Sequence, residues 1–94
     1  GAFQLMHAAR QVLLDYEEHD PYKRDVQINL FRTEILLSNW GQTDFTQHAV
    51  ERAETIFKLY PAYLSMLQIV ADDMLFVGRD DLAAEYNARI NAAK

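Results

Sequence analysis

Apolar residues recur along this chain at the spacing of helical faces, and no segment alternates apolar and polar residues as a strand would. The most apolar stretch is residues 61–77, where two adjoining helical faces are apolar. These faces hold Leu64, Leu67, Val70, Ala71 and Met74 on one side and Tyr63, Met66, Ile69 and Phe76 on the other. A helix that is apolar on more than one side has to be packed on more than one side. The pattern therefore predicts that residues 61–77 form the central helix of the fold.

Four further helices are predicted from the same spacing. They cover residues 2–18, 21–40, 44–60 and 80–94. Pro21 and Pro61 are read as helix starts, because proline is favoured in the first helical position. Gly41 and Gly78 are read as helix ends, because glycine adopts the left-handed conformation that closes many helices. In the first helix, the predicted buried stripe consists of Leu5, Ala9, Val12, Leu13 and Tyr16.

A shift of thirty-four residues aligns several helical positions with one another. The matched pairs are Ala49 with Ala83, Glu51 with Glu85, Ile56 with Ile90, Ile35 with Ile69, Leu36 with Val70 and Trp40 with Met74. Thirty-four residues is the period of tetratricopeptide repeats, which stack helical hairpins. We therefore expect an all-α fold in which five helices form a right-handed, tetratricopeptide-like stack of antiparallel hairpins. An irregular antiparallel bundle with similar spacings is the alternative.

Length, charge and composition limit the kinds of binding partner and site that the chain can have. The 94 residues suffice for one domain with a small core, which we place at residues 2–94. The net charge is −5, and the nine Lys and Arg residues are scattered, so neither a nucleic acid nor an anionic membrane surface is an expected partner. No segment is apolar over enough residues to span a bilayer. The chain has no Cys, which excludes disulfides and thiolate metal sites.

Motifs for catalysis do not occur in the sequence. We find no phosphate-binding loop, dinucleotide-binding glycine pattern, HExxH pair or nucleophile elbow. His7, His19 and His48 lie on three separate segments and are read as surface or half-buried residues. Residues 17–20, Glu-Glu-His-Asp, are potential metal ligands, but adjacent helical residues point in different directions. We therefore expect no catalytic residue, no metal site and no cofactor in this chain.

Two acidic residues, Asp72 and Asp73, interrupt the most apolar helix. Either both face solvent, or they supply a polar contact inside a groove that binds a peptide or docks a domain, and adjacent acids rarely bury together. Glu51 and Arg52, on the polar side of residues 44–60, are read as solvated charges. The candidate groove residues are Tyr63, Asp72, Asp73, Tyr86 and Trp40, since an aromatic ring can be shared between core and groove.

Two short motifs, Leu30-Phe31-Arg32 and the Val-Gly-Arg-Asp-Asp of residues 77–81, carry a family resemblance. Together with Tyr60-Pro61, Ala83 and Ala88-Arg89 at matching places, they make residues 26–94 resemble a region of bacterial membrane O-oligosaccharyltransferases. The region is the C-terminal soluble part of the pilin-glycosylating kind, which is grouped with O-antigen ligases and Wzy-type polymerases. The resemblance implies a tail on a many-span enzyme that moves a lipid-linked glycan onto a protein or lipid acceptor. The catalytic residues of that family belong to membrane-facing loops, so none is assigned here.

The expected function is accordingly that of a non-catalytic accessory domain attached to the bacterial inner membrane. It would position a protein or peptide acceptor, or stabilise the membrane portion of its parent chain. The start Gly1-Ala2-Phe3, without an initiator Met, is read as the scar of an excised fragment. The alternative is a generic tetratricopeptide-like protein–protein interaction module, and an independent small enzyme is the least supported hypothesis. The outer faces of the first and last helices are candidates for pairing in a homodimer.

Overall fold

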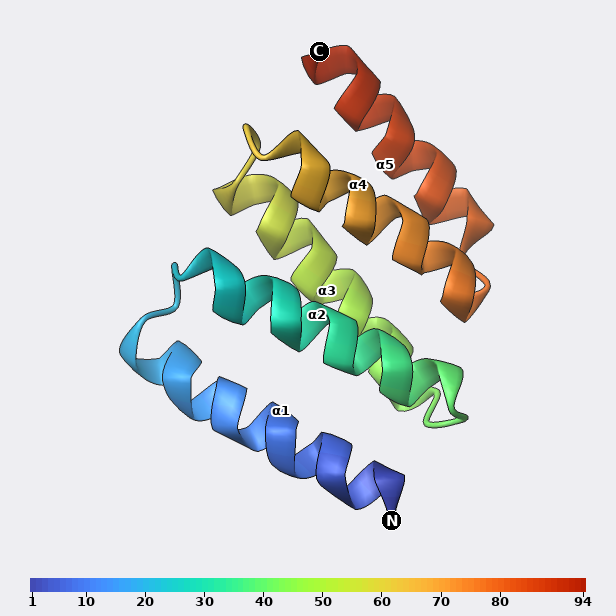
Figure 1. The fold of residues 1–94 in the computed structure, drawn as a ribbon. Coiled ribbons are helices and arrows are strands. Elements are labelled where there is room, and N and C mark those ends of the chain that lie inside the picture. The colour runs from blue at the N-terminus through green and yellow to red at the C-terminus, as the bar shows by residue number, and fades with distance from the viewer.

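Five α-helices and one short 3₁₀ helix make up the computed structural model, which describes residues 1–94 and contains no strand (Figure 1). The elements are α1 (Ala2–His19), α2 (Arg24–Asn39), α3 (Asp44–Leu59), α4 (Leu64–Asp73), η1 (Met74–Val77) and α5 (Asp80–Ala93). Figure 1 shows the helices following one another across the molecule, with the two termini at opposite ends. The predicted all-α class with five helices is therefore confirmed.

Both prolines lie in turns rather than at helix starts, so the predicted starts of the second and central helices are wrong. Pro21 is inside a turn closed by the Lys23 N–H and the Asp20 carbonyl at 3.3 Å. Pro61 is inside a turn closed by the Tyr63 N–H and the Tyr60 carbonyl at 3.2 Å. Proline presets the φ of a turn's second residue as readily as that of a helix's first, so spacing alone did not separate the two.

Both glycines end helices as predicted. Gly78 has a φ of +72° directly after η1, and Gly41 has a φ of +104° after α2. Residues with a Cβ rarely adopt these angles. The predicted central helix is divided, because α4 ends at Asp73 and the chain continues as the 3₁₀ turn Met74–Val77 before Gly78.

The core lies between α2, α3, α4 and α5. Its buried members are Phe31, Ile35, Ala49, Ala53, Ile56, Tyr60, Met66, Leu67, Val70, Ala71, Met74, Ala83, Tyr86 and Ile90. The helix with the most buried residues is α2, which packs against α1, α3, α4 and η1. The prediction that residues 61–77 form the centre is therefore wrong in part. One face of α4 is buried, but Tyr63, Ile69 and Phe76 on its second predicted face are exposed.

Helix α1 contributes no residue to the core. Three members of its predicted buried stripe are largely exposed: Leu5 at 74%, Val12 at 60% and Tyr16 at 55%. The side of α1 that meets α2 carries the half-buried Met6, Arg10, Leu13, Leu14 and Glu17. Helical spacing shows that α1 has an apolar face, but it does not show which side meets a neighbour.

A buried ionic network attaches α1 to α2 and α3. Glu34 of α2 is fully buried, and its carboxylate accepts hydrogen bonds from Nε of Arg52 at 2.7 Å and Nε of Arg10 at 3.1 Å. Arg52 also donates from Nη1 to Glu17 at 2.6 Å and to the side-chain oxygen of Gln27 at 2.9 Å. The network thus spans three helices, and every buried side-chain polar atom of the protein has a partner.

The predicted solvent exposure of Arg52 is wrong. Arg52 was read as a solvated charge, but its side chain is mostly buried between Glu34 and Glu17. Burial opposes its charge, yet hydrogen bonds to Glu34 and Glu17 hold the pKa of Arg52 above its ordinary value. Glu17 and Arg52 come from segments far apart in the sequence, and helical periodicity carries no information on such pairing.

The unit from α1 through its turn to α2 recurs, forty residues further on, from α3 to α4. The turns at residues 20–23 and 60–63 close with the same backbone hydrogen bonds. Burial repeats too, at Val26 and Met66, Gln27 and Leu67, Leu30 and Val70, Phe31 and Ala71, Thr33 and Asp73, and Glu34 and Met74. Equivalent positions at the starts of α2 and α4 therefore occupy equivalent places in the fold.

The thirty-four-residue shift holds only for α3 and α5. Ala49 and Ala83 are both buried under this shift, as are Ile56 and Ile90. Glu51 and Glu85 are both exposed. The pairs that join α2 to α4 and η1 fail, since Leu36 and Trp40 are exposed whereas Val70 and Met74 are buried. The link from η1 to α5 is shorter than the link from α2 to α3, so no single period describes the whole chain.

Candidate functional site

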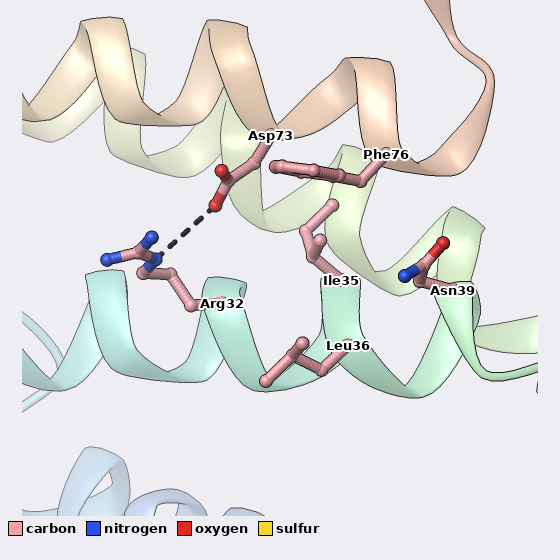
Figure 2. A pocket seen from close by; sticks show the side chains of 6 residues that line it. All are labelled: Arg32, Ile35, Leu36, Asn39, Asp73 and Phe76. Carbon is pink, nitrogen blue, oxygen red and sulfur yellow. Dashed lines mark ion pairs between the residues drawn. The ribbon is translucent and has the colours of Figure 1, made fainter.

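A cleft of about 300 Å³ lies between α2 and the segment where α4 passes into η1 (Figure 2). Its lining residues are Arg32, Ile35, Leu36, Asn39, Asp73 and Phe76. The four residues from α2 share one helical face because their spacing follows three- and four-residue steps. Figure 2 shows the Phe76 ring beside Asp73, facing Ile35 across the cleft. The cleft thus has an apolar middle with polar groups at its ends.

Asp73 and Arg32 form the only ion pair of the cleft, with Oδ2 and Nε 3.4 Å apart. The Asp73 carboxyl is almost fully buried, whereas the Arg32 side chain is more than half exposed. Burial raises the pKa of Asp73 above its ordinary value, and the neighbouring Arg32 guanidinium offsets only part of this rise. Arg32 approaches Asp73 through Nε, so its terminal N–H groups remain available to a ligand.

Asp73→Asn should stabilise the protein at pH 7 by up to about 1 kcal/mol. A pKa that is higher in the folded state than in the unfolded chain means that folding disfavours the ionised carboxylate. This cost is present at neutral pH and disappears as the pH falls through the folded pKa towards the pKa of an aspartate in the unfolded chain. Urea unfolding at several pH values should therefore show a gain for Asp73→Asn that shrinks under acid conditions.

The matched control for this substitution is Asp72→Asn, because Asp72 is exposed and accepts a hydrogen bond from Gln68 at 2.9 Å. It should give no gain in stability at neutral pH. A loss of stability for Asp73→Asn at pH 7 that is recovered in acid would mean that attraction to Arg32 outweighs burial of the carboxylate.

A second, more open depression continues the cleft towards α1. It is lined by Ala9, Val12, Leu13, Asn29, Arg32, Thr33 and Leu36. Arg32 and Leu36 belong to both hollows, so one continuous surface runs from α1 across α2 to η1. Arg32 is the only charged residue of the second depression.

Of the five candidate groove residues, Asp73 alone lines the cleft. Asp72 faces solvent, and Tyr63 is exposed beneath the Arg24 guanidinium, 3.9 Å from its ring centroid. Trp40 packs edge-on against Phe3 with ring centroids 5.7 Å apart.

Tyr86 is completely buried, and its hydroxyl donates to Glu54 at 3.0 Å. Burial together with the negative charge of Glu54 raises the pKa of the Tyr86 hydroxyl. The five candidates are therefore not brought together at one place.

Sequence reasoning missed Arg32, Leu36, Asn39 and Phe76 as site residues. A signal for the first three was present, since Arg32, Leu36 and Asn39 follow helical spacing with mixed polarity, which is unusual for a face meant for the core. Phe76 was assigned to an apolar packing face, but it is exposed, as are Tyr63 and Ile69 of the same face.

The side chains of this surface offer apolar contacts together with charged and amide groups. The cleft contains no Ser, His or Lys that an acid or base could activate. His7 and His48 both pack on the Phe45 ring, at 5.5 and 5.4 Å between ring centroids, away from the cleft. No group of three or more His, Cys, Asp or Glu side chains is placed to hold a metal ion, and residues 17–20 form no such group.

No family model, curated protein or solved structure matches this chain. None of its helices combines the length and the apolar character needed to cross a bilayer. The geometry of the cleft and the distribution of exposed side chains therefore carry the functional argument.

Proposed function

We propose that this chain is a non-catalytic helical interaction domain that binds a polypeptide in the cleft between α2 and η1. The observation that carries the proposal is the one-sided distribution of exposed apolar side chains. The large exposed apolar residues lie on α1, α2, α4, η1 and the loops flanking α2 and α4, and none lies on α3 or α5. Apolar exposure concentrated in this way and rimmed by polar groups is typical of protein interaction sites.

The chemistry of the cleft indicates what kind of segment fits it. Ile35, Leu36 and Phe76 offer an apolar surface for one or two apolar side chains. The free N–H groups of Arg32 and the carboxamide of Asn39 can bind a carboxylate or a backbone carbonyl. The preferred ligand is therefore a peptide with an acidic residue close to an apolar one.

Selection from a phage-displayed library of random peptides on the immobilised protein tests this function. Affinities of the selected peptides are then measured by calorimetry for the wild type, Phe76→Ala and Leu75→Ala. Phe76→Ala should weaken binding about tenfold or more, because an aromatic anchor of the cleft is lost. Leu75→Ala is the matched control, since Leu75 is similarly exposed but does not line the cleft. Peptides that bind independently of Phe76, or no peptide at all, would contradict the proposal.

A tetratricopeptide-like stack is the architecture that we propose for this domain. The hairpins of this stack are α2–α3 and α4–α5. The small residues Ala49 and Ala83 are buried at equivalent places in their second helices, α3 and α5, where they permit close approach of a neighbouring helix. The recurrence of the α1–α2 unit as α3–α4 also supports a stacked rather than an irregular arrangement.

The family resemblance favours a second candidate, an accessory domain of a bacterial membrane glycan ligase or polymerase. Three of the motif residues have structural places: Leu30 and Phe31 are fully buried, and Gly78 forms the left-handed turn. Arg32, the remaining residue of the first motif, lines the cleft. In such a parent enzyme the cleft would hold the acceptor polypeptide or a loop of the membrane portion.

Genomic sequence upstream of Ala2 tests the second candidate. A reading frame that continues upstream through several hydrophobic spans is the expected result. A frame without such spans would eliminate the glycan enzyme as the parent and leave the interaction domain as proposed.

A further inference from the structure

The repeat within the fold shows that one face of α1 lacks the cover that the equivalent face of α3 has. Under the forty-residue shift, Ala9, Leu13 and Tyr16 correspond to Ala49, Ala53 and Ile56. The three α3 residues are completely buried in the core that α3 shares with α2. On α1, by contrast, Tyr16 is 55% exposed and Ala9 is exposed as well, while Leu13 is half-buried on the side that meets α2. The α1 face therefore has the residue pattern of a face that packs against another helix.

The uncovered face forms a continuous stripe. It consists of Leu5, Ala9, Val12 and Tyr16, which follow one another at four-, three- and four-residue steps. The stripe is about 16 Å long at the helical rise, and Ala9 and Val12 also border the depression over α2. An α-helix is the element that matches a stripe of this shape, just as α2 covers the equivalent stripe of α3.

We propose that the stripe is covered by α1 of a second copy of this chain, in an antiparallel pair. Charge favours this occupant and this direction. The acidic residues of α1, Asp15, Glu17 and Glu18, all lie in its C-terminal part, and its first turn has none. An antiparallel pair places each acidic end beside the positive N-terminal end of the other helix. A parallel pair would instead bring the acidic ends together.

Side-chain size is also self-complementary in the antiparallel arrangement. The centre of the stripe lies between Ala9 and Val12, so each Leu5 faces the other copy's Tyr16 and each Ala9 faces Val12. Such a two-fold contact uses the same patch on both copies. The other outer helix, α5, exposes no large apolar side chain and offers no comparable patch. The cleft between α2 and η1 stays open, so the dimer presents two such clefts, whereas the depression lined by Ala9 and Val12 becomes part of the contact.

Sedimentation velocity of the protein over micromolar to sub-millimolar concentrations tests the dimer. The wild type should sediment as a dimer and Val12→Asp as a monomer, because the substitution buries two unpaired carboxylates at the centre of the contact. Leu75→Asp is the matched control, since Leu75 is about as exposed as Val12 but lies on η1, and it should remain dimeric. Circular dichroism checks that the variants stay folded. A monomeric wild type, or a Val12→Asp variant that still dimerises, overturns the proposal.

Cysteine cross-linking tests the direction of the pair independently of the charge variant. The chain has no cysteine, so single substitutions report one contact each. A mixture of Leu5→Cys and Tyr16→Cys proteins should form a mixed disulfide on mild oxidation. Each variant alone should not, because identical positions at the stripe ends would be about 16 Å apart along the antiparallel pair, beyond disulfide reach. Self-linking of Leu5→Cys, or no mixed product, overturns the antiparallel dimer.

Discussion

Replacing Arg52 by Met should lower the free energy of unfolding by about 3 kcal/mol. The substitution leaves the fully buried Glu34 with Arg10 as its one remaining cation and leaves Glu17 with the Gln27 amide but no cation. A buried carboxylate that loses a cation retains its desolvation cost without the compensating attraction. Urea unfolding followed by circular dichroism measures the loss.

Arg89→Met is the matched control for this experiment. Arg89 also bridges two carboxylates, with 3.0 Å to Glu54 and 2.7 Å to Glu85, but it is substantially exposed. Exposed ion pairs contribute little, so the control should lose less than about 1 kcal/mol. Equal losses for the two variants would show that burial of the Arg52 network adds nothing to its strength.

Phe31→Ala should cost about 3–4 kcal/mol of stability, because it removes a completely buried aromatic ring from the core between α2 and its neighbours. The next residue provides a sharp comparison. Arg32→Ala should cost no more than about 1 kcal/mol, because the Arg32 side chain is more than half exposed and the loss is confined to its ion pair with Asp73. Chemical unfolding of both variants measures the difference.

The pairing of these two variants separates a structural from a binding role within the Leu30-Phe31-Arg32 motif. Arg32→Ala should impair only the affinity for peptides selected on the cleft. A large stability loss for Arg32→Ala would place Arg32 with the core residues and remove the reason to treat it as a ligand contact.

Local patterns predicted the helices of this fold well, because amphipathic spacing and turn residues act within a few positions of the chain. Gly41 and Gly78, for example, occupy the left-handed conformations that their places in the sequence indicate. The sequence predicted less well which helices pack against each other and through which faces. The stripe of α1 was recognised as apolar, but its orientation depends on where the neighbouring helices lie.

The cleft and the ionic network were not predictable for the same reason. Arg32 and Asp73 come from different helices, as do Glu17 and Arg52, and a charge looks the same in a sequence whether it will be solvated or paired in the interior. The break of the central helix at Met74, shortly before the exposed Phe76, has no strong signal before Gly78.

The way in which α1 is attached has a consequence for the two hollows of the binding surface. Because α1 supplies no residue to the core, we expect movement of α1 to disturb the packing of the other four helices less than movement of any core helix would. The hollow bordered by α1 can therefore widen at the cost of the charge contacts and of the half-buried Met6, Leu13 and Leu14, whereas the walls of the cleft beside η1 are fixed by the core itself. One molecule thus combines a rigid pocket with an adjustable one.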